Sequence, residues 1–103
     1  MGTIPIPQEI LDQADRLVTG ALTGGVQLKC TELRADVVTA TAALLVQKPE
    51  SLRSRSLEKI AKRCAHLANV AYEKAMGEPH EGENVIRNAR DHFRTQVFTR
   101  SFP

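Results

Sequence analysis

Apolar residues return at steps of three and four along most of this chain, and polar residues fill the intervals. This spacing lines one face of a helix, whereas a half-buried strand would alternate at every second residue. Segments with this spacing are separated by glycine, proline or polar stretches. The pattern predicts an all-α fold, a small bundle of about four helices arranged as two helical hairpins.

The first predicted helix begins at Pro7, whose missing N–H suits a first helical turn, and ends at Gly24–Gly25. Residues 1–6 contain two X-Pro steps and are expected to form an extended arm. Acidic residues occupy the first half of this helix, where the macrodipole favours anions: Glu9, Asp12 and Asp15. Its apolar face consists of Ile10, Leu11, Ala14, Leu17, Val18, Ala21 and Leu22.

The second segment supports two interpretations. A heptad seam runs through Val26, Cys30, Leu33, Val37, Ala40 and Leu44. The stretch GVQLKC alternates like a strand, but Ala and Leu dominate the second half, so we predict a helix from about 27 to 47. A second stripe, Val38, Thr41 and Leu45, lies beside the seam. A helix with so wide an apolar arc is either central in the bundle or carries a second interface.

Pro49 separates the second helix from a third, which Ser51 or Ser54 can cap and which ends at Gly77. Its inward positions are Leu57, Ile60, Cys64, Leu67 and Ala71. The fourth helix begins at Asn84 and points Ile86, Ala89, Phe93 and Val97 inward. Residues 98–103 form a tail without a period, and its Phe98 and Phe102 are expected to dock on a surface.

The composition fits one small domain that spans residues 1–103, of which 42% are hydrophobic and 25% charged. Trp is absent and aromatic residues make up only 4%, so the core must consist of Leu, Val, Ile and Ala. The net charge of +2 is unevenly distributed, because residues 1–50 hold four basic and six acidic side chains whereas residues 51–103 hold ten and six. This distribution indicates either complementary packing of the two halves or a docking surface with one sign of charge. The small size of the bundle and the wide apolar arc of its second helix predict self-association, with a homodimer favoured.

The N-terminus carries no secretory signal, and no apolar run approaches the length that spans a bilayer. We therefore expect a cytoplasmic protein without membrane contact, in which Cys30 and Cys64 are free thiols. A disulfide between these cysteines would require an oxidising compartment.

Basic residues form two stripes. Arg55, Lys59, Lys62 and His66 step by four, three and four, and Arg87, Arg90 and Arg94 step by three and four. If the two helices are neighbours, the stripes can merge into a patch that binds the phosphates of nucleic acid or a nucleotide. The alternative is an ordinary solvated face, in which Glu58 pairs with Lys62 four residues later. No aromatic stacking platform and no helix-turn-helix signature accompany the stripes.

Catalysis and metal binding have little support in the sequence. Cys64 and His66 lie about 200° apart around a helix, so they do not share a site. His80 lies among Glu78, Glu81 and Glu83, but one histidine without fixed ligand spacing is a weak metal signal. The chain has no glycine-rich phosphate loop and no Gly-x-Ser-x-Gly motif. We expect a protein that is not an enzyme and that needs no cofactor or metal.

These observations predict a small regulatory or inhibitory protein that binds another protein through an apolar helix face and blocks it. The partner can be a transcription factor or another regulatory target, since many anti-activators and phage inhibitors are helical proteins of this size. The predicted contact residues are Val38, Leu45, Phe98 and Phe102, with Arg87, Arg90 and Arg94 at the rim. The alternative function is nucleic-acid or nucleotide binding through Arg55, Lys59 and Lys62, joined by the arginines of the fourth helix.

Overall fold

The helices lie close to the positions that the apolar spacing predicts. The computed structural model describes residues 6–47, 54–79 and 84–97. Within these ranges it contains helices α1 (Gln8–Thr23), α2 (Arg34–Gln47), α3 (Ser54–Met76) and α4 (Asn84–Thr95), and a short 3₁₀ helix, η1 (Thr31–Leu33), before α2. The described residues form no strand, which confirms the all-α prediction.

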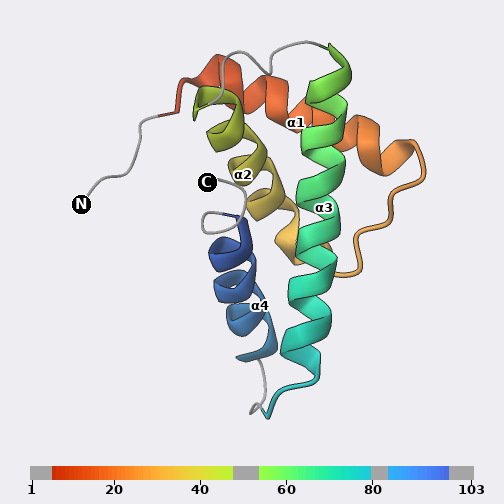
Figure 1. The fold of residues 1–103 in the computed structure, drawn as a ribbon, viewed down its shortest axis with the longest axis vertical. Helices are drawn as coiled ribbons and strands as arrows, with labels where there is room; N and C mark the ends of the chain where they lie inside the picture. Colours follow the sequence, from red (N-terminus) through yellow and green to blue (C-terminus); the bar gives the residue numbers. More distant parts are fainter. Residues whose placement is uncertain (1–5, 48–53, 80–83, 98–103) are drawn as a thin grey trace.

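The long helix α3 organises the bundle (Figure 1). Helix α4 runs antiparallel to its C-terminal half, and these two helices pack most extensively on each other. Helix α1 lies across the other end of the molecule, against α2 and the N-terminal half of α3. Helix α2 occupies the middle, so α1 and α4 lie at opposite ends of the fold.

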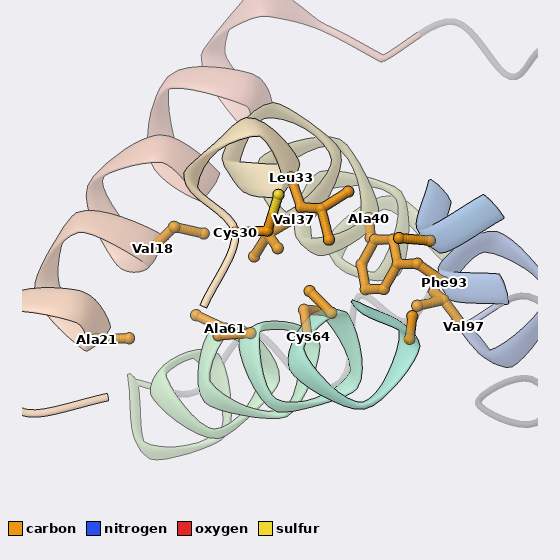
Figure 2. Packing of buried hydrophobic residues seen from close by; sticks show 14 of the residues in the cluster. Val18, Ala21, Cys30, Leu33, Val37, Ala40, Ala61, Cys64, Phe93 and Val97 are labelled. Carbon is orange, nitrogen blue, oxygen red and sulfur yellow. The ribbon is translucent and has the colours of Figure 1, made fainter. Parts of the chain in front are cut away.

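The main core depends on small residues along α3. Six of them have no exposed surface: Ala61, Cys64, Ala65, Ala68, Ala71 and Ala75. Because these side chains are short, the neighbouring helices can approach α3 closely. Figure 2 shows larger side chains directed towards this seam, including Leu33 and Val37 around α2 and Phe93 from α4. Phe93 is 1% exposed and fixes α4 to the bundle.

A smaller cluster holds the other end of the molecule together. It consists of Ala14 from α1, Ala42 and Leu45 from α2, and Leu57 from α3. Half-buried Ile6 and Ile10 pack against it from the beginning of the chain. Three helices therefore meet at this cluster, and α2 contributes to both cores.

Val38 and Leu45, which we predicted to contact a partner, are not exposed on α2. Leu45 is 2% exposed and Thr41 is fully buried, while Val38 is half-buried and packs against both clusters. The wide apolar arc is used inside the bundle, because α1, α3 and η1 all contact α2. Of the two interpretations of this arc, the structure supports the central helix.

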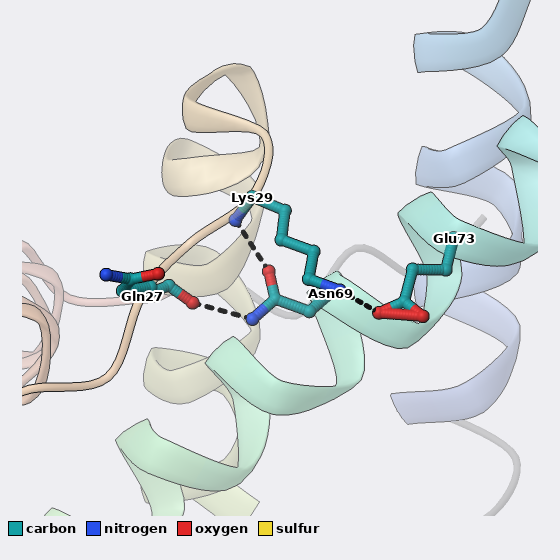
Figure 3. A network of polar contacts seen from close by, with 4 residues as sticks. All are labelled: Gln27, Lys29, Asn69 and Glu73. Carbon is teal, nitrogen blue, oxygen red and sulfur yellow. Dashed lines mark hydrogen bonds and ion pairs between the residues drawn. The ribbon is translucent and has the colours of Figure 1, made fainter.

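The predicted start of the second helix at residue 27 is also wrong. Residues 26–30 form neither helix nor strand, Gly25 has a φ of +114°, and α2 begins at Arg34 after η1. Figure 3 shows how Asn69 of α3 holds this segment from the side. Its Nδ2 donates to the carbonyl of Gln27 at 2.6 Å, and its Oδ1 accepts from the backbone N–H of Lys29 at 2.8 Å.

This bridge fixes residues 26–30 on α3. The Lys29 ammonium also pairs with the Glu73 carboxylate one helical turn after Asn69. Along the segment Val26 and Leu28 are half-buried and Cys30 is buried, while Gln27 and Lys29 are exposed. The alternation in GVQLKC thus belongs to a non-helical segment with alternating burial, and the Asn69 side chain satisfies two of its backbone groups.

Some predictions lie outside the described residues, including the arm before Ile6, the cap at Ser51 and both Phe98 and Phe102. Asn84 opens α4 as predicted, and Pro7 precedes the first residue of α1. In the ranges that the structure describes, no helix is long and apolar enough to cross a bilayer.

Candidate functional site

The outer face of α4 is the surface on which the structure gathers the most predicted site residues. Ala89 and Phe93 of this helix are buried, as is Val97 just beyond it. Arg87, Arg90 and Arg94 are exposed on the opposite side. The steps of three and four in the sequence therefore give α4 an apolar inner face and an arginine outer face. This arrangement confirms that the three arginines share one stripe, as predicted.

Asp36, in the first turn of α2, organises two of these arginines. Its Oδ2 accepts from Nε of Arg90 at 2.9 Å, and its Oδ1 lies 4.0 Å from Nη2 of Arg94. The Asp36 side chain is only 19% exposed, so this carboxylate is a largely buried support for the more exposed side chains of Arg90 and Arg94. The contact with Arg90 uses Nε, which leaves the two Nη groups as the donors nearest to solvent.

The arginines open into a groove between η1 and α4, which we call the arginine groove. It is broad, has a volume of about 750 Å³, and is lined by Glu32, Asn84, Ile86, Arg87, Arg90, Asp91 and Arg94. Cations and carboxylates thus share its walls, and half-buried Ile86 adds apolar surface. Such an open, mixed-charge lining fits a segment of another macromolecule better than an enclosed small molecule.

The basic stripe of α3 lies in different surroundings. Lys59, Lys62, Arg63 and His66 are all exposed. Within the described part of the chain none of the three cations Lys59, Lys62 and Arg63 forms an ion pair, so the predicted pair between Glu58 and Lys62 is absent. The side chain of Arg55 lies outside the described residues.

The two basic stripes line different hollows. Lys62 and Glu58 border a hollow of about 390 Å³ between α3 and α1, whose wall also includes Arg16, Leu17, Gly20, Ala21 and Gly24. The arginine groove lies between α4 and η1 instead. Although α3 and α4 are neighbours, these hollows share no lining residue, and the structure gives the stripes separate surroundings.

The remaining chemical candidates are tied into the fold. Cys30 and Cys64 are free and buried, and burial raises the pKa of the Cys64 thiol above 9.0 against the smaller opposing effect of its hydrogen bond with Thr41. Glu78 lies 2.7 Å from Nε2 of His92, a contact that joins the end of α3 to α4. In the described ranges no three His, Cys, Asp or Glu side chains are grouped to hold a metal ion.

Sequence reasoning missed the carboxylates around the arginines. Asp36 lies 54 residues before Arg90, and Glu32 belongs to a segment that we predicted as continuous helix. No local spacing links these acids to α4, because the link exists only after α2 and α4 are packed together. Their presence means that the arginine groove is not simply a cationic patch.

Comparison with known proteins found no similar protein or structure. No protein-family model, no curated protein and no solved structure matches this chain. The functional argument therefore depends on the geometry and charge of its own surfaces.

Proposed function

We propose that this protein is a small non-enzymatic regulator that binds another protein in the arginine groove and blocks a surface which that partner needs. One observation carries the proposal: Arg87, Arg90 and Arg94 open into a single groove, and the carboxylate of Asp36 backs Arg90 and Arg94. Guanidinium groups that are held in place lose less side-chain entropy when they meet a carboxylate.

The charge pattern of the groove favours a protein partner. A nucleic acid would bring a dense row of phosphates close to Glu32 and Asp91, and these carboxylates would repel it. A protein segment with carboxylates for the arginines and a cation for the acidic wall is complementary to both kinds of charge. Ile86 supplies apolar area beside the charged groups of the groove. Binding through these charges does not require further exposed apolar residues near α4.

The mechanism that we propose is occlusion. The arginines steer an acidic segment of the partner into the groove, and the body of the bundle then covers the surrounding partner surface. Compared with our sequence-based hypothesis, the contact moves from α2 to α4, because Leu45 of α2 is buried in the core and Val38 is half-buried. Inhibition follows from steric exclusion and requires no chemical step.

A second candidate function is binding of nucleic acid through α3. It is favoured by Lys59, Lys62 and Arg63, which are exposed and have no ion pair in the described part of the chain. Uncompensated cations of this kind gain the most from counterion release when they meet phosphates. This surface is separate from the arginine groove, so the two functions can be tested on different variants.

The test compares three forms of the tagged protein as bait in nuclease-treated lysate of its native cells. They are the wild type, the groove variant Arg87→Glu/Arg94→Glu, and the matched control Lys59→Glu/Lys62→Glu, which also reverses two exposed cations. We expect the wild type and the control to retain one stoichiometric protein that the groove variant loses. In calorimetry with that protein, the groove variant should bind about tenfold more weakly or worse.

Two results would overturn the proposal. One is retention of the same protein by the groove variant at the wild-type level. The other is a wild-type eluate that holds no protein after nuclease treatment but holds nucleic acid before it, with loss of that nucleic acid in the Lys59→Glu/Lys62→Glu variant. The second result would establish the α3 surface as the functional one.

A further inference from the structure

A second surface of this chain carries charges opposite to those of the arginines in the groove. The solvent side of α1 exposes Glu9 and Asp12, which we call the acidic face of α1. Asp12 accepts a hydrogen bond from Nε2 of Gln8 at 2.9 Å, and neither carboxylate forms an ion pair within the described residues. Asp15, by contrast, is already paired with Arg34 at 2.7 Å.

Two pairs of opposite charge on these helices have the same spacing. Arg87 and Arg90 of α4 are three residues apart, and so are Glu9 and Asp12 of α1. All four side chains are exposed. When the two helices lie side by side, the pair of carboxylates can therefore face the pair of arginines.

The two surfaces cannot meet within one molecule. Figure 1 places α1 across one end of the bundle and α4 at the other, with α2 and the length of α3 between them. Among the described residues no cation forms an ion pair with the acidic face, and the groove is open. The complementary surfaces can therefore pair only between two copies of the chain.

We propose that, without another partner, the arginine groove is occupied by the acidic face of α1 from a second copy. This inference rests on the proposed function, since it names an occupant of the same groove, and it makes self-association compete with capture of the regulated partner. A contact between two different surfaces is heterologous, so it gives either a pair in which both contacts form or a larger head-to-tail assembly. Because exposed charges carry the contact, salt weakens it.

The experiment is sedimentation velocity of the full chain over a range of protein concentrations, at low and at physiological salt. We expect wild-type protein to associate at low salt and to dissociate as salt rises. The face variant Glu9→Lys/Asp12→Lys and the groove variant Arg87→Glu/Arg94→Glu should each associate about tenfold more weakly or worse. The Lys59→Glu/Lys62→Glu variant should associate like the wild type, and circular dichroism should show the same helix content in every form.

The decisive experiment mixes the face variant with the groove variant. The face variant keeps an intact groove and the groove variant keeps an intact acidic face, so an equimolar mixture of the two should form a complex that neither forms alone. Wild-type protein that stays monomeric throughout, association that both variants retain, or a mixture that stays monomeric would each overturn the inference. If a cellular partner is still captured through the groove in any of these cases, the proposed function stands without self-association.

Discussion

Helices α2 and α4 use their apolar residues in opposite ways. In α2, every residue from Ala40 to Leu45 is buried, and α1, α3 and η1 surround it. In α4, only Ala89 and Phe93 are buried, and the arginines occupy the outer face. The difference shows that a broad apolar arc belongs to a helix at the centre of a bundle, whereas a narrow one leaves a face for other molecules.

This comparison relocates the functional surface. A large apolar side chain on α2 is part of the core, and its removal affects the whole molecule. A charged side chain on α4 contributes little to the core, and its removal affects what the molecule can bind. Stability and binding should therefore respond to different substitutions in these two helices.

Leu45→Ala on α2 should produce the largest effect. Leu45 is 2% exposed in the cluster that joins α1, α2 and α3, so the substitution leaves a cavity and lowers the free energy of unfolding by about 2–5 kcal/mol. Chemical denaturation with a circular dichroism readout measures this change. A loss below about 0.5 kcal/mol, the level typical of surface positions, would restore Leu45 as an exposed contact residue.

Asn69→Ala should have the next largest effect, because the Asn69 side chain bonds the backbone of residues 26–30 to α3. The substitution removes both hydrogen bonds to the backbone at Gln27 and Lys29, which lowers the free energy of unfolding by about 1–3 kcal/mol. Hydrogen exchange at Lys29 should accelerate. In the control Gln27→Ala, the exposed side chain changes but the backbone carbonyl remains, and stability should stay near the wild-type value.

The contacts of Asn69 show why only part of the fold could be predicted from the sequence. The spacing of Ala89, Phe93 and Val97 identified the inner face of α4, because local periodicity determines which side of an amphipathic helix is buried. Residues 26–30 are held by the side chain of Asn69, which is about 40 residues away in the sequence. Local alternation alone could therefore not decide whether this segment forms a strand or a helix. The second stripe of α2 was ambiguous for the same reason, since its neighbours are distant in sequence.

In the candidate site, too, local spacing predicted some features, while others depend on residues far apart in the sequence. The steps between Arg87, Arg90 and Arg94 predicted that they share a face. The pairing of Arg90 and Arg94 with Asp36, and the presence of Glu32 on the groove wall, arise from packing between segments far apart in the chain. Sequence reasoning therefore found the cations of the groove but not the acids that determine which partner it suits.

Asp36→Asn tests how far α2 controls the arginines of α4. The substitution removes the negative charge behind Arg90 and Arg94, which are 45% and 64% exposed, so the stability should fall by about 1 kcal/mol or less. The loss of a carboxylate should also make α4 a better polyanion binder. We expect tighter binding to heparin and a steeper dependence on salt than in the wild type. Unchanged heparin affinity would contradict the supporting role of Asp36.

Arg87→Ala should have the smallest effect on stability. Arg87 is exposed and forms no ion pair in the described part of the chain, so the free energy of unfolding should change by no more than about 0.5 kcal/mol. Partner binding measured by calorimetry should nevertheless weaken, mainly through a slower association rate. A large loss of stability with unchanged binding would remove the contrast between α4 and α2.

The most direct test of the central claim is hydrogen exchange of the protein alone and in complex with the captured partner. If the partner lies in the arginine groove, backbone amides of η1 and α4 should gain protection, while those of residues 57–66 in α3 should exchange as in the free protein. Protection confined to residues 57–66, with α4 unchanged, would contradict the assignment and place the binding surface on the basic stripe of α3.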